Sequence, residues 1–397
     1  MKYDLVFEGG GAKGMVFAGA CEELSKRGHT FERLLGTSAG AITATLLAAG
    51  YTPDEMMAAL MDKSDSGKSV FSEFMGTPPP FTDDEIAASA TLRLLDGIDF
   101  TFIPNFAEKR AHRELVSALA SNERFRNILS LIERGGWYSA DRFVSWFRSK
   151  LDSGPWQNGT RAFSHLTMKQ FFETTGVELT LIASNIVAGT MLVLNHRTAP
   201  DCPIVWAVRM SMSIPLVWNE VIWEAGWGQY RGRDITGNAV VDGGLLSNFP
   251  IELFISDAPH VTKLMGPKGD NPVLGLLIDE TLPVAKGWLV NINIDPNELK
   301  TLQRLRSLAD TVTGAHDKMV IEEYRHLVAR LPAQGYGTTE FDMTDERREA
   351  LVRAGADAIA LYFDTPAGLV LPSKSVAPGT VAQSTADRIA TGLLAES

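Results

Sequence analysis

The first fifty residues repeat one pattern twice: a short apolar strand, a glycine-rich turn and a helix. Tyr3–Glu8 is the first predicted strand and Met15–Arg27 is its helix, and the second unit runs from Phe31 to Gly50. Two such units in succession favour parallel strands with helices packed against the faces of the sheet. The predicted fold class is therefore α/β, with a central, mostly parallel sheet flanked by helices.

The first turn carries three consecutive glycines, which lose more backbone entropy on folding than other residues. We therefore expect another group to approach the main chain closely at this turn. The turn also fits the dinucleotide-binding pattern G-x-G-x-x-G through Gly9, Gly11 and Gly14, and Glu32 follows at about the distance of a ribose-binding acid. A Rossmann-type dinucleotide-binding protein is thus an alternative, although the segment that leads to Glu32 is short for a second strand.

The second turn, Gly36–Gly40 (GTSAG), fits the pattern G-x-S-x-G. Small neighbours allow a sharp turn from strand to helix that exposes the serine Oγ. A helix that begins near Ala39 would place partial positive charge beside Ser38, and this charge favours an anionic oxygen. Backbone N–H groups of the glycine loop, at Gly10, Gly11 and Ala12, could donate to an oxyanion on the neighbouring strand end. The pattern predicts an acyl-transfer site, and the alternative is that Ser38 only caps the helix.

A nucleophilic serine needs a base. Asp242 ends a short apolar strand and precedes two glycines, where a carboxylate can project from the strand end. An ordinary Asp-Gly turn is the alternative. The later histidines, His260, His316 and His326, lie in no recognisable catalytic turn. We therefore predict Asp242 as the base, with burial raising its pKa from the usual value of about 3.9.

Three motifs, FEGGGAKG (Phe7–Gly14), GTSAG and DGGLLSNFP (Asp242–Pro250), resemble the patatin-like phospholipase family in order and spacing. The resemblance implies a three-layer sandwich with a helical insertion and a catalytic dyad of Ser38 and Asp242. Ser213-Ile214-Pro215 is similar to the approach to the aspartate strand, and Phe341–Thr344 is similar to the closing strand. Lys13 stands where the family often has arginine. The implied oxyanion loop consists of Gly9, Gly10, Gly11, Ala12, Lys13 and Gly14.

The same resemblance implies a function. We expect a serine acyl hydrolase of the phospholipase A type that cleaves membrane phospholipids or other lipid esters through an acyl-enzyme, with no metal and no cofactor. Bacterial proteins of this family include antiviral effectors activated by cyclic nucleotides. A cyclic nucleotide activator, a role in antiviral defence and assembly into a homo-oligomer are therefore further expectations.

The predicted domain organisation is one catalytic domain over residues 1–366 and a loosely ordered tail over 367–397. Residues 64 to about 160 begin with a stretch rich in Ser, Gly and Pro and continue as helices, which favours a lid or insertion. Residues 298–331 have apolar positions near helical spacing and are predicted to be mainly helical.

Composition limits the partners and the location. A net charge of -11 disfavours binding to a nucleic acid polymer. The two cysteines exclude a disulfide framework, no secretory signal is visible, and no apolar run is long enough to span a bilayer. We expect a cytoplasmic protein that lies at the inner membrane surface when active. The tryptophans of 218–227 suit core packing better than a membrane interface.

Overall fold

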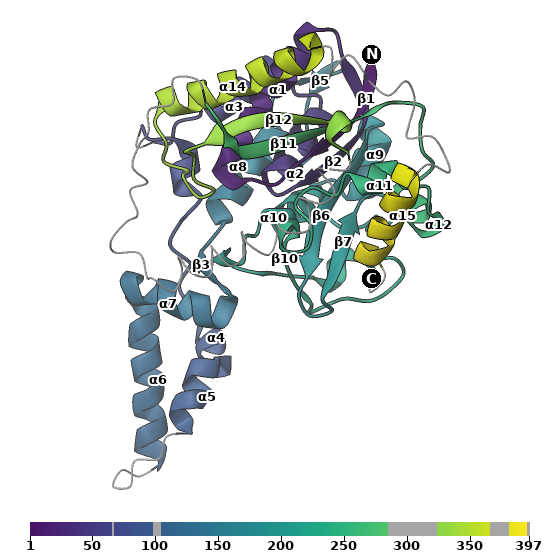
Figure 1. Cartoon of the computed structure of the whole chain (residues 1–397). Helices are drawn as coiled ribbons and strands as arrows, with labels where there is room; N and C mark the ends of the chain where they lie inside the picture. The colour runs from purple at the N-terminus through teal and green to yellow at the C-terminus, as the bar shows by residue number, and fades with distance from the viewer. Residues whose placement is uncertain (66, 98–104, 285–323, 366–380, 395–397) are drawn as a thin grey trace.

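In the computed structural model, a mixed sheet lies at the centre and helices cover both of its faces (Figure 1). The structure describes residues 1–65, 67–97, 105–284, 324–365 and 381–394. The strands of the sheet are β1 (Lys2–Phe7), β2 (Thr30–Thr37), β6 (Glu178–Asn185), β7 (Thr190–Leu194), β9 (Val221–Ile222), β10 (Ala239–Asp242), β11 (Val273–Pro283) and β12 (Val328–Gln334). They follow the order β12-β11-β1-β2-β6-β10-β9, and β7 also pairs with β6. The pairs from β12 to β6 are parallel, so the predicted fold class is confirmed.

The helices follow from capping signals and apolar stripes in the sequence. Thr52 with Glu55 begins α3 and Thr167 with Gln170 begins α9, each through a capping box. The helices are α1 (Val16–Lys26), α2 (Ala39–Ala48), α3 (Pro53–Leu60), α4 (Asp83–Ala88), α5 (Ala90–Asp96), α6 (Asn105–Ser121), α7 (Glu123–Arg134), α8 (Asp141–Leu151), α9 (Met168–Thr175), α10 (Ile204–Ser211), α11 (Glu252–Ile255), α12 (Pro259–Met265), α14 (Asp345–Asp364) and α15 (Val381–Leu394). Short strands outside the main sheet are β3 (Gly136–Tyr138) with β8 (Leu216–Trp218), and β4 (Pro155–Trp156) with β5 (Gly159–Thr160).

Alternate residues of β1 face two separate apolar clusters. Leu5 and Phe7 pack with side chains of α1, α2 and α14, whereas Val6 packs with side chains of α11, α12 and α15. Successive side chains of a strand point to opposite faces of the sheet. The molecule therefore has three layers, with a sheet between two layers of helices, as the resemblance implied.

Strand β6 brings the ends of β2 and β10 together. Residues 181–185 of β6 pair with β7 on one edge, so β2 and β10 both lie on the other edge. Along that edge β2 runs parallel to β6 as far as the pair Thr37↔Ile182, and β10 runs antiparallel as far as the pair Asp242↔Ala183. Successive residues of a strand are about 3.3 Å apart. The two strands therefore end facing each other, and the turns that follow them meet at one place on the sheet.

Residues 64–160 divide into two kinds of structure. Phe71, Phe74, Phe143 and Trp146 pack into the main core beside α2. By contrast, α4 to α7 project from the body (Figure 1) around a small cluster of their own, formed by Ile86, Leu92, Val116, Ala120 and Leu129. We call residues 83–134 the helical insertion, and the segments on either side of it pack with the body of the protein.

The structure corrects the expectation of a loose tail over 367–397. Helix α15 occupies 381–394, and Ala386, Ala390 and Leu394 are buried in the cluster under α11 and α12. This stripe of small and apolar residues lies within a segment rich in Ser and Thr, and that composition on its own favours a loosely ordered tail. Residues 367–380 and 395–397 lie outside the described residues.

Two further expectations near the C-terminal end of the sheet are wrong. Residues 298–323 of the predicted helix lie outside the described residues, but from Val328 onward the chain is strand β12. Residues 341–344 do not form the closing strand, because Thr344 instead caps α14 by accepting the Arg347 N–H. The closing strand is β12, whose apolar residues fit strand and helix spacing equally well.

The indoles of 218–227 lie inside the protein, which confirms core packing. Trp218, Trp223 and Trp227 are 1%, 0% and 5% exposed. Two of the ring N–H groups also find acceptors, because Trp218 donates to Phe74 O at 2.9 Å and Trp223 to Gly228 O at 2.9 Å. Within the described ranges, no helix combines the length and apolar character needed to cross a bilayer.

Candidate active site

Ser38 occupies the turn between β2 and α2 in a strained backbone conformation. Its φ of 52° and ψ of -119° lie where residues other than glycine are uncommon. The Ser38 N–H donates to Ser211 Oγ at 3.0 Å, at the end of α10, and the Ser38 side chain is 5% exposed. The turn therefore holds the hydroxyl at one point above the sheet, as a nucleophile requires.

The two glycines of GTSAG are needed because main-chain atoms crowd them. A Cβ on Gly36 would lie 2.3 Å from Gly40 O, and a Cβ on Gly40 would lie 2.4 Å from Phe7 O. A Cβ on Gly9 would lie 3.0 Å from the Cβ of Ser38. The sharp turn thus packs directly on the end of β1, and the glycine loop runs alongside Ser38.

Asp242 lies beside this turn because β10 ends opposite β2. The Asp242 N–H donates to Ser213 O at 2.9 Å, so Ser213 does approach the aspartate strand as the resemblance implied. Asp242 Oδ1 accepts the Gly244 N–H at 2.8 Å. A Cβ on Gly243 would lie 2.4 Å from Ile182 O, so the chain can turn here only with a glycine.

Burial sets the protonation of Asp242. The residue is 4% exposed, and desolvation raises the pKa of its carboxyl to about 7, against the lowering effects of the Ser38 side chain and the Gly244 N–H. Oδ2 is buried and makes no hydrogen bond to any described group. Because the Ser38 side chain lowers the pKa of this carboxyl, Ser38 lies close to it, although no hydrogen bond of normal geometry joins Ser38 to Oδ2. Catalytic hydrogen bonds are often this loose before substrate binds. A carboxyl with a pKa near neutrality suits a general base.

The glycine loop offers two N–H groups beside Ser38. The Gly9 N–H donates to Asn248 O at 3.1 Å, the Ala12 N–H to Thr338 O at 2.8 Å, and the Lys13 N–H to Gly10 O at 3.1 Å. Among the described residues, the N–H groups of Gly10 and Gly11 have no acceptor. Ala12 could serve as an oxyanion donor only after leaving Thr338. The geometry therefore favours Gly10 and Gly11.

The other loop residues shape the turn. A 3-10 turn over Gly11–Met15 contains Lys13, whose buried side chain ends in an ion pair with the exposed Glu280. Gly14 lies against α2, because its Cβ would be 2.4 Å from the Cβ of Ala39. Gly11 has a φ of 54°, and its Cβ would lie 2.1 Å from Thr338 O, so a side chain fits at neither position.

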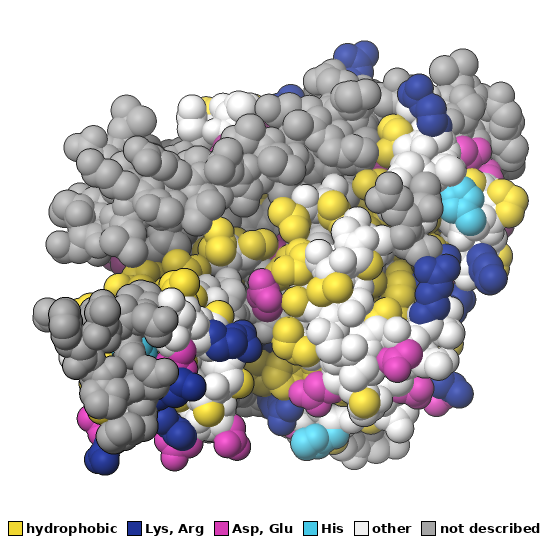
Figure 2. All heavy atoms as spheres, turned by 90° about the horizontal axis from the view of Figure 1, so that it is seen from below, with side chains coloured by type: hydrophobic (Ala, Val, Ile, Leu, Met, Phe, Trp, Pro, Cys, Tyr) yellow, Lys and Arg dark blue, Asp and Glu magenta, His cyan; other side chains and the backbone are white. Residues whose placement is uncertain are grey.

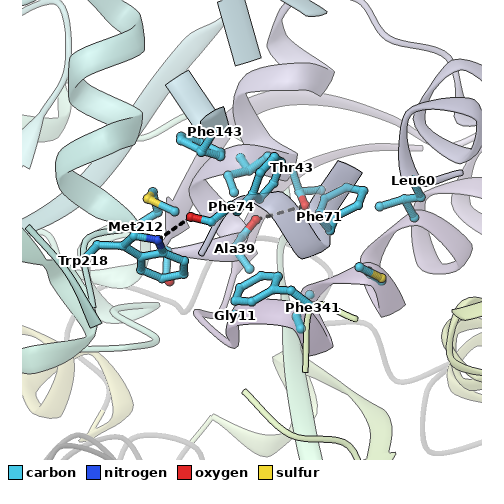
Figure 3. Close-up of a pocket in the computed structure, with 15 residues that line it drawn as sticks. Gly11, Ala39, Thr43, Leu60, Phe71, Phe74, Phe143, Met212, Trp218 and Phe341 are labelled. Atoms are coloured by element: carbon cyan, nitrogen blue, oxygen red, sulfur yellow. Dashed lines mark hydrogen bonds between the residues drawn. The ribbon is translucent and has the colours of Figure 1, made fainter. Parts of the chain in front are cut away.

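An apolar pocket opens beside Ser38, with about 540 Å³ of empty space that is partly open to solvent (Figure 3). Its polar side chains are those of Ser38 and Thr43, and the Thr43 hydroxyl donates to Ala39 O at 3.1 Å. Phe74, whose carbonyl accepts the Trp218 indole N–H, joins the segment before the helical insertion to this wall. The lining residues are Gly11, Ala12, Gly14, Met15, Ser38, Ala39, Ile42, Thr43, Leu60, Phe71, Phe74, Phe143, Met212, Trp218 and Phe341.

Sequence reasoning missed most of this pocket and two polar residues. Ser211, which holds the Ser38 N–H, gave no signal because an isolated serine at a helix end is common. Asn248, which contacts the glycine loop, lies within the third motif but received no role. The Asn248 side-chain Nδ2 donates to Gly9 O at 2.8 Å and to Glu8 Oε1 at 3.2 Å.

The structure overturns the dinucleotide-binding alternative. Lys2 pairs with Thr30 where β1 and β2 begin, and the glycine loop follows the other end of β1. Glu32, near the start of β2, therefore lies at the opposite end of these strands from the glycine loop. Glu32 there contacts Lys2 and Asn271, at 2.9 and 2.7 Å. A ribose-binding acid must follow the second strand on the same edge as the glycine loop.

Histidines and metal ligands do not form an alternative site within the described ranges. Neither His260 nor His326 lines the pocket, and His316 lies outside the described residues. In that described part, no group of three or more His, Cys, Asp or Glu side chains is placed to hold a metal ion.

Comparison with known proteins gives one family and several relatives. A family model described as patatin-like phospholipase matches residues 5–255. The uncharacterized protein YqhO of Bacillus subtilis (strain 168) is 29% identical over 91% of this chain and 98% of its own length. The probable lipid hydrolase 463L of Invertebrate iridescent virus 6 is 23% identical over 63% of this chain and 62% of its own.

Two solved structures are also similar, at low sequence identity. VipD from Legionella pneumophila has a TM-score of 0.44 and 16% identity, covering 90% of this chain and 66% of the VipD chain. ExoU, solved in complex with SpcU from the type III secretion system of Pseudomonas aeruginosa, has a TM-score of 0.36 and 18% identity, covering 91% of this chain and 53% of the ExoU chain.

Proposed function

This chain belongs to the patatin-like phospholipase family and is a lipid acyl hydrolase, and we propose that Ser38 is its nucleophile and Asp242 its base. One observation carries the proposal. The strained Ser38 turn lines an apolar pocket and lies beside two groups suited to acyl transfer, a carboxyl whose pKa burial raises to about 7 and a loop with two N–H groups that have no acceptor among the described residues.

In the first half-reaction, Asp242 accepts the Ser38 proton while Oγ attacks the ester carbonyl carbon. The carbonyl oxygen becomes an oxyanion, and the Gly10 and Gly11 N–H groups donate to it. When the tetrahedral intermediate collapses, Asp242 returns its proton to the leaving alcohol. The product is an acyl-enzyme at Ser38 and a free alcohol.

In the second half-reaction, water takes the place of the alcohol. Asp242 accepts a proton from the water as its oxygen attacks the acyl carbon, and the same two N–H groups hold the oxyanion. Collapse breaks the bond to Ser38 Oγ, which recovers the proton from Asp242. The fatty acid leaves, and both side chains return to their starting states.

The pocket favours a fatty-acyl chain as the part of the substrate that is recognised. Its walls are apolar and aromatic apart from Ser38 and Thr43, and each CH₂ buried there contributes about 0.8 kcal/mol. We propose membrane phospholipids, cleaved as by a phospholipase A, or other fatty-acyl esters as substrates.

Replacement of the nucleophile tests the proposal. Ser38→Ala should abolish both release of fatty acid from phospholipid vesicles and labelling by a fluorophosphonate. Ser153→Ala is the matched control, since Ser153 is exposed and lies outside the pocket. Mass spectrometry of the lipids should find free fatty acid and lysophospholipid with wild type and with the control. Hydrolysis retained by Ser38→Ala would refute Ser38 as nucleophile.

We also propose that the protein is cytoplasmic and associates peripherally with a lipid surface. Phe125, Ile128 and Ile132 lie on one side of α7 and are 49%, 38% and 58% exposed, an apolar stripe of the kind that enters the boundary of a bilayer. Figure 2 shows hydrophobic side chains on the face seen from below, including in the hollow beside the helical insertion. Sedimentation with phospholipid vesicles measures this association.

Activation by a cyclic nucleotide, a role in antiviral defence and assembly into a homo-oligomer stay predictions that rest on the resemblance to bacterial members of the family. Fatty-acid release measured with and without cyclic dinucleotides tests the first. Light scattering of the purified protein tests the last. A cyclic nucleotide that leaves the rate unchanged at saturating concentrations would remove both the activator and the regulated effector role.

A further inference from the structure

One residue, Asn248, holds the peptide groups on both sides of Gly9. Its backbone oxygen accepts the Gly9 N–H at 3.1 Å, and its side-chain Nδ2 donates to Gly9 O at 2.8 Å. The second of these bonds matters for chemistry, because Gly9 O belongs to the same peptide unit as the Gly10 N–H.

A trans peptide is planar, so its N–H points opposite to its C=O. When Asn248 Nδ2 fixes the direction of the Gly9 carbonyl, it therefore fixes the direction of the Gly10 N–H. The next peptide is held in the same way, because Gly10 O accepts the Lys13 N–H at 3.1 Å and so orients the Gly11 N–H. Among the described residues, a side chain holds the Gly9 carbonyl, whereas the Gly10 carbonyl is held by a main-chain N–H.

We infer that Asn248 is a positioning residue that aims the Gly10 N–H at the oxyanion. The inference rests on the proposed function, and it assigns a task to a side chain that takes no part in the proton transfers proposed above. Asn248 also lies on the loop that follows Asp242, so one residue ties the loop of the base to the loop of the oxyanion hole.

The contacts of Asn248 require an amide at this position. Nδ2 lies between two acceptors, Gly9 O and Glu8 Oε1, at 2.8 and 3.2 Å, and Glu8 Oε2 accepts the Ile278 N–H at 2.6 Å. Oδ1 occupies the space that side chains on Gly9 and Gly244 would need, 2.1 and 2.8 Å from their Cβ positions. An aspartate would fit this space, but it would turn a carboxylate oxygen toward the Gly9 carbonyl and the Glu8 carboxylate.

Two substitutions test the inference. Asn248→Ala removes the donor, and Asn248→Asp replaces it with an acceptor of the same shape. We expect kcat on a soluble short-chain ester to fall roughly 10- to 100-fold in both, less than the loss of an oxyanion donor itself, while KM changes little. Labelling by a fluorophosphonate should slow by a similar factor, because its phosphoryl oxygen accepts hydrogen bonds from the same N–H groups.

A matched control exists at the other end of the sheet. Asn271 Nδ2 donates to Glu32 Oε2 at 2.7 Å, and Asn271 is half-buried as Asn248 is. Because Asn271 Nδ2 also donates to Asp4 Oδ1 at 3.4 Å, Asn271→Asp introduces the same kind of repulsion, here with the carboxylates of Glu32 and Asp4, far from Ser38. It should lower the Tm and leave kcat unchanged.

The double variant Glu8→Gln with Asn248→Asp separates positioning from simple structural support. The new Gln amide can donate to the new carboxylate and still accept the Ile278 N–H, so the Tm should recover. The bond to Gly9 O is not restored, so kcat should stay low. If Asn248→Ala does not fold, the kcat and Tm of this double variant are sufficient to test the inference.

Two outcomes would overturn the inference. One is a folded Asn248→Ala protein with the kcat of wild type, and the other is a double variant that regains kcat together with its Tm. Failure of the proposed function has a different signature, since Ser38→Ala would then retain activity whatever Asn248 does.

Discussion

Different kinds of contact stabilise two regions of the molecule, the proposed catalytic edge of the sheet and the helical insertion. At the catalytic edge, formed by Gly9–Gly14, Gly36–Gly40 and Asp242–Asn248, main-chain atoms meet main-chain atoms, as where Gly40 lies against Phe7 O. In the helical insertion, aliphatic side chains meet one another in a small cluster. Other apolar side chains of the insertion face outward, such as Leu94 and Ile132, at 72% and 58% exposure.

This difference decides how strictly each region specifies its residues. Where a carbonyl lies within about 3 Å of a would-be Cβ, glycine alone fits, and the position becomes visible in the sequence as a motif. Where side chains fill a small cluster, many apolar residues of similar volume serve equally well. Substitutions in the two regions should therefore differ greatly in effect.

The largest effect is expected for Gly40→Ala. The added methyl would lie 2.4 Å from Phe7 O and 2.7 Å from Glu8 O, at the end of β1 where Phe7 pairs with Gly36 of β2. We expect a loss of at least about 3 kcal/mol in the free energy of unfolding, measured by urea denaturation. Gly226→Ala is the control and should be nearly neutral, because nothing lies within 4 Å of its Cβ position. Equal stability of the two variants would contradict the steric account.

The next largest effect is expected for Asp242→Asn, which removes the proposed base. We expect kcat/KM to fall by about 10² to 10⁴. In wild type, kcat/KM should rise as Asp242 loses its proton, with a midpoint near its pKa of about 7, and then level off. The residual activity of Asp242→Asn should lack that midpoint. An unchanged pH profile would show that another group titrates.

Ionisation of Asp242 should affect stability and activity in opposite directions: as the pH rises, kcat/KM should increase and the free energy of unfolding should decrease. Its pKa is about 7 when folded and about 3.9 when unfolded, so the unfolded chain ionises first. The contribution of Asp242 to the free energy of unfolding is therefore complete below the pKa of the unfolded state and is lost as the pH rises through the pKa of the folded state. Asp242→Asn should therefore have a higher Tm than wild type at about pH 8, with a difference that shrinks toward about pH 4. A Tm difference independent of pH would contradict burial as the cause of the pKa shift.

A smaller and selective effect is expected in the apolar pocket. Ile42 lines it one helical turn beyond Ser38, so Ile42→Phe should fill part of the space for an acyl chain. We expect kcat/KM for long-chain esters to fall roughly 10-fold or more while that for butyryl esters changes little. Ile42→Val, which keeps the space open, should hydrolyse both classes as wild type does. Equal losses on both classes would mean that the acyl chain lies elsewhere.

The smallest effect is expected on the outer side of the helical insertion. Replacing Phe125 and Ile132 with Ser should change the free energy of unfolding by no more than about 0.5 kcal/mol each, because both side chains are half-exposed or more. Hydrolysis of a soluble ester should be unaffected, while sedimentation with vesicles should decrease. Vesicle binding that equals wild type would remove α7 from the proposed contact with lipid.

The same contrast explains what the sequence revealed. The sequence predicts the glycine loop, the Ser38 turn and the Asp242 turn because each contains positions where only glycine fits, and such positions appear in the sequence as motifs. The three-layer fold followed from the strand and helix units that carry these turns. The adjacency of Ser38 and Asp242 was an expectation of the resemblance, and its structural cause is the meeting of β2 and β10 along β6.

What the sequence did not reveal depends on side-chain packing or on contacts remote in the chain. The apolar residues of β12 suit the period of a strand and that of a helix, so the sequence does not distinguish the two, and α15 gives a weak signal because its buried face consists mainly of small residues. Phe71 and Phe74 could not be placed in the pocket, since apolar residues before an insertion pack in many ways. Asn248 was not recognised because its partners, Glu8 and Gly9, lie at the other end of the family match.

The central claim is that Ser38 reacts and that Asp242 governs its reactivity. The most direct measurement is the rate of fluorophosphonate labelling against pH for wild type and Asp242→Asn, with the labelled peptide identified by mass spectrometry. The account predicts one label, on Ser38, with a rate that rises through about pH 7 in wild type and stays low and flat in Asp242→Asn. A label on another residue, or the same rise in both proteins, would contradict it.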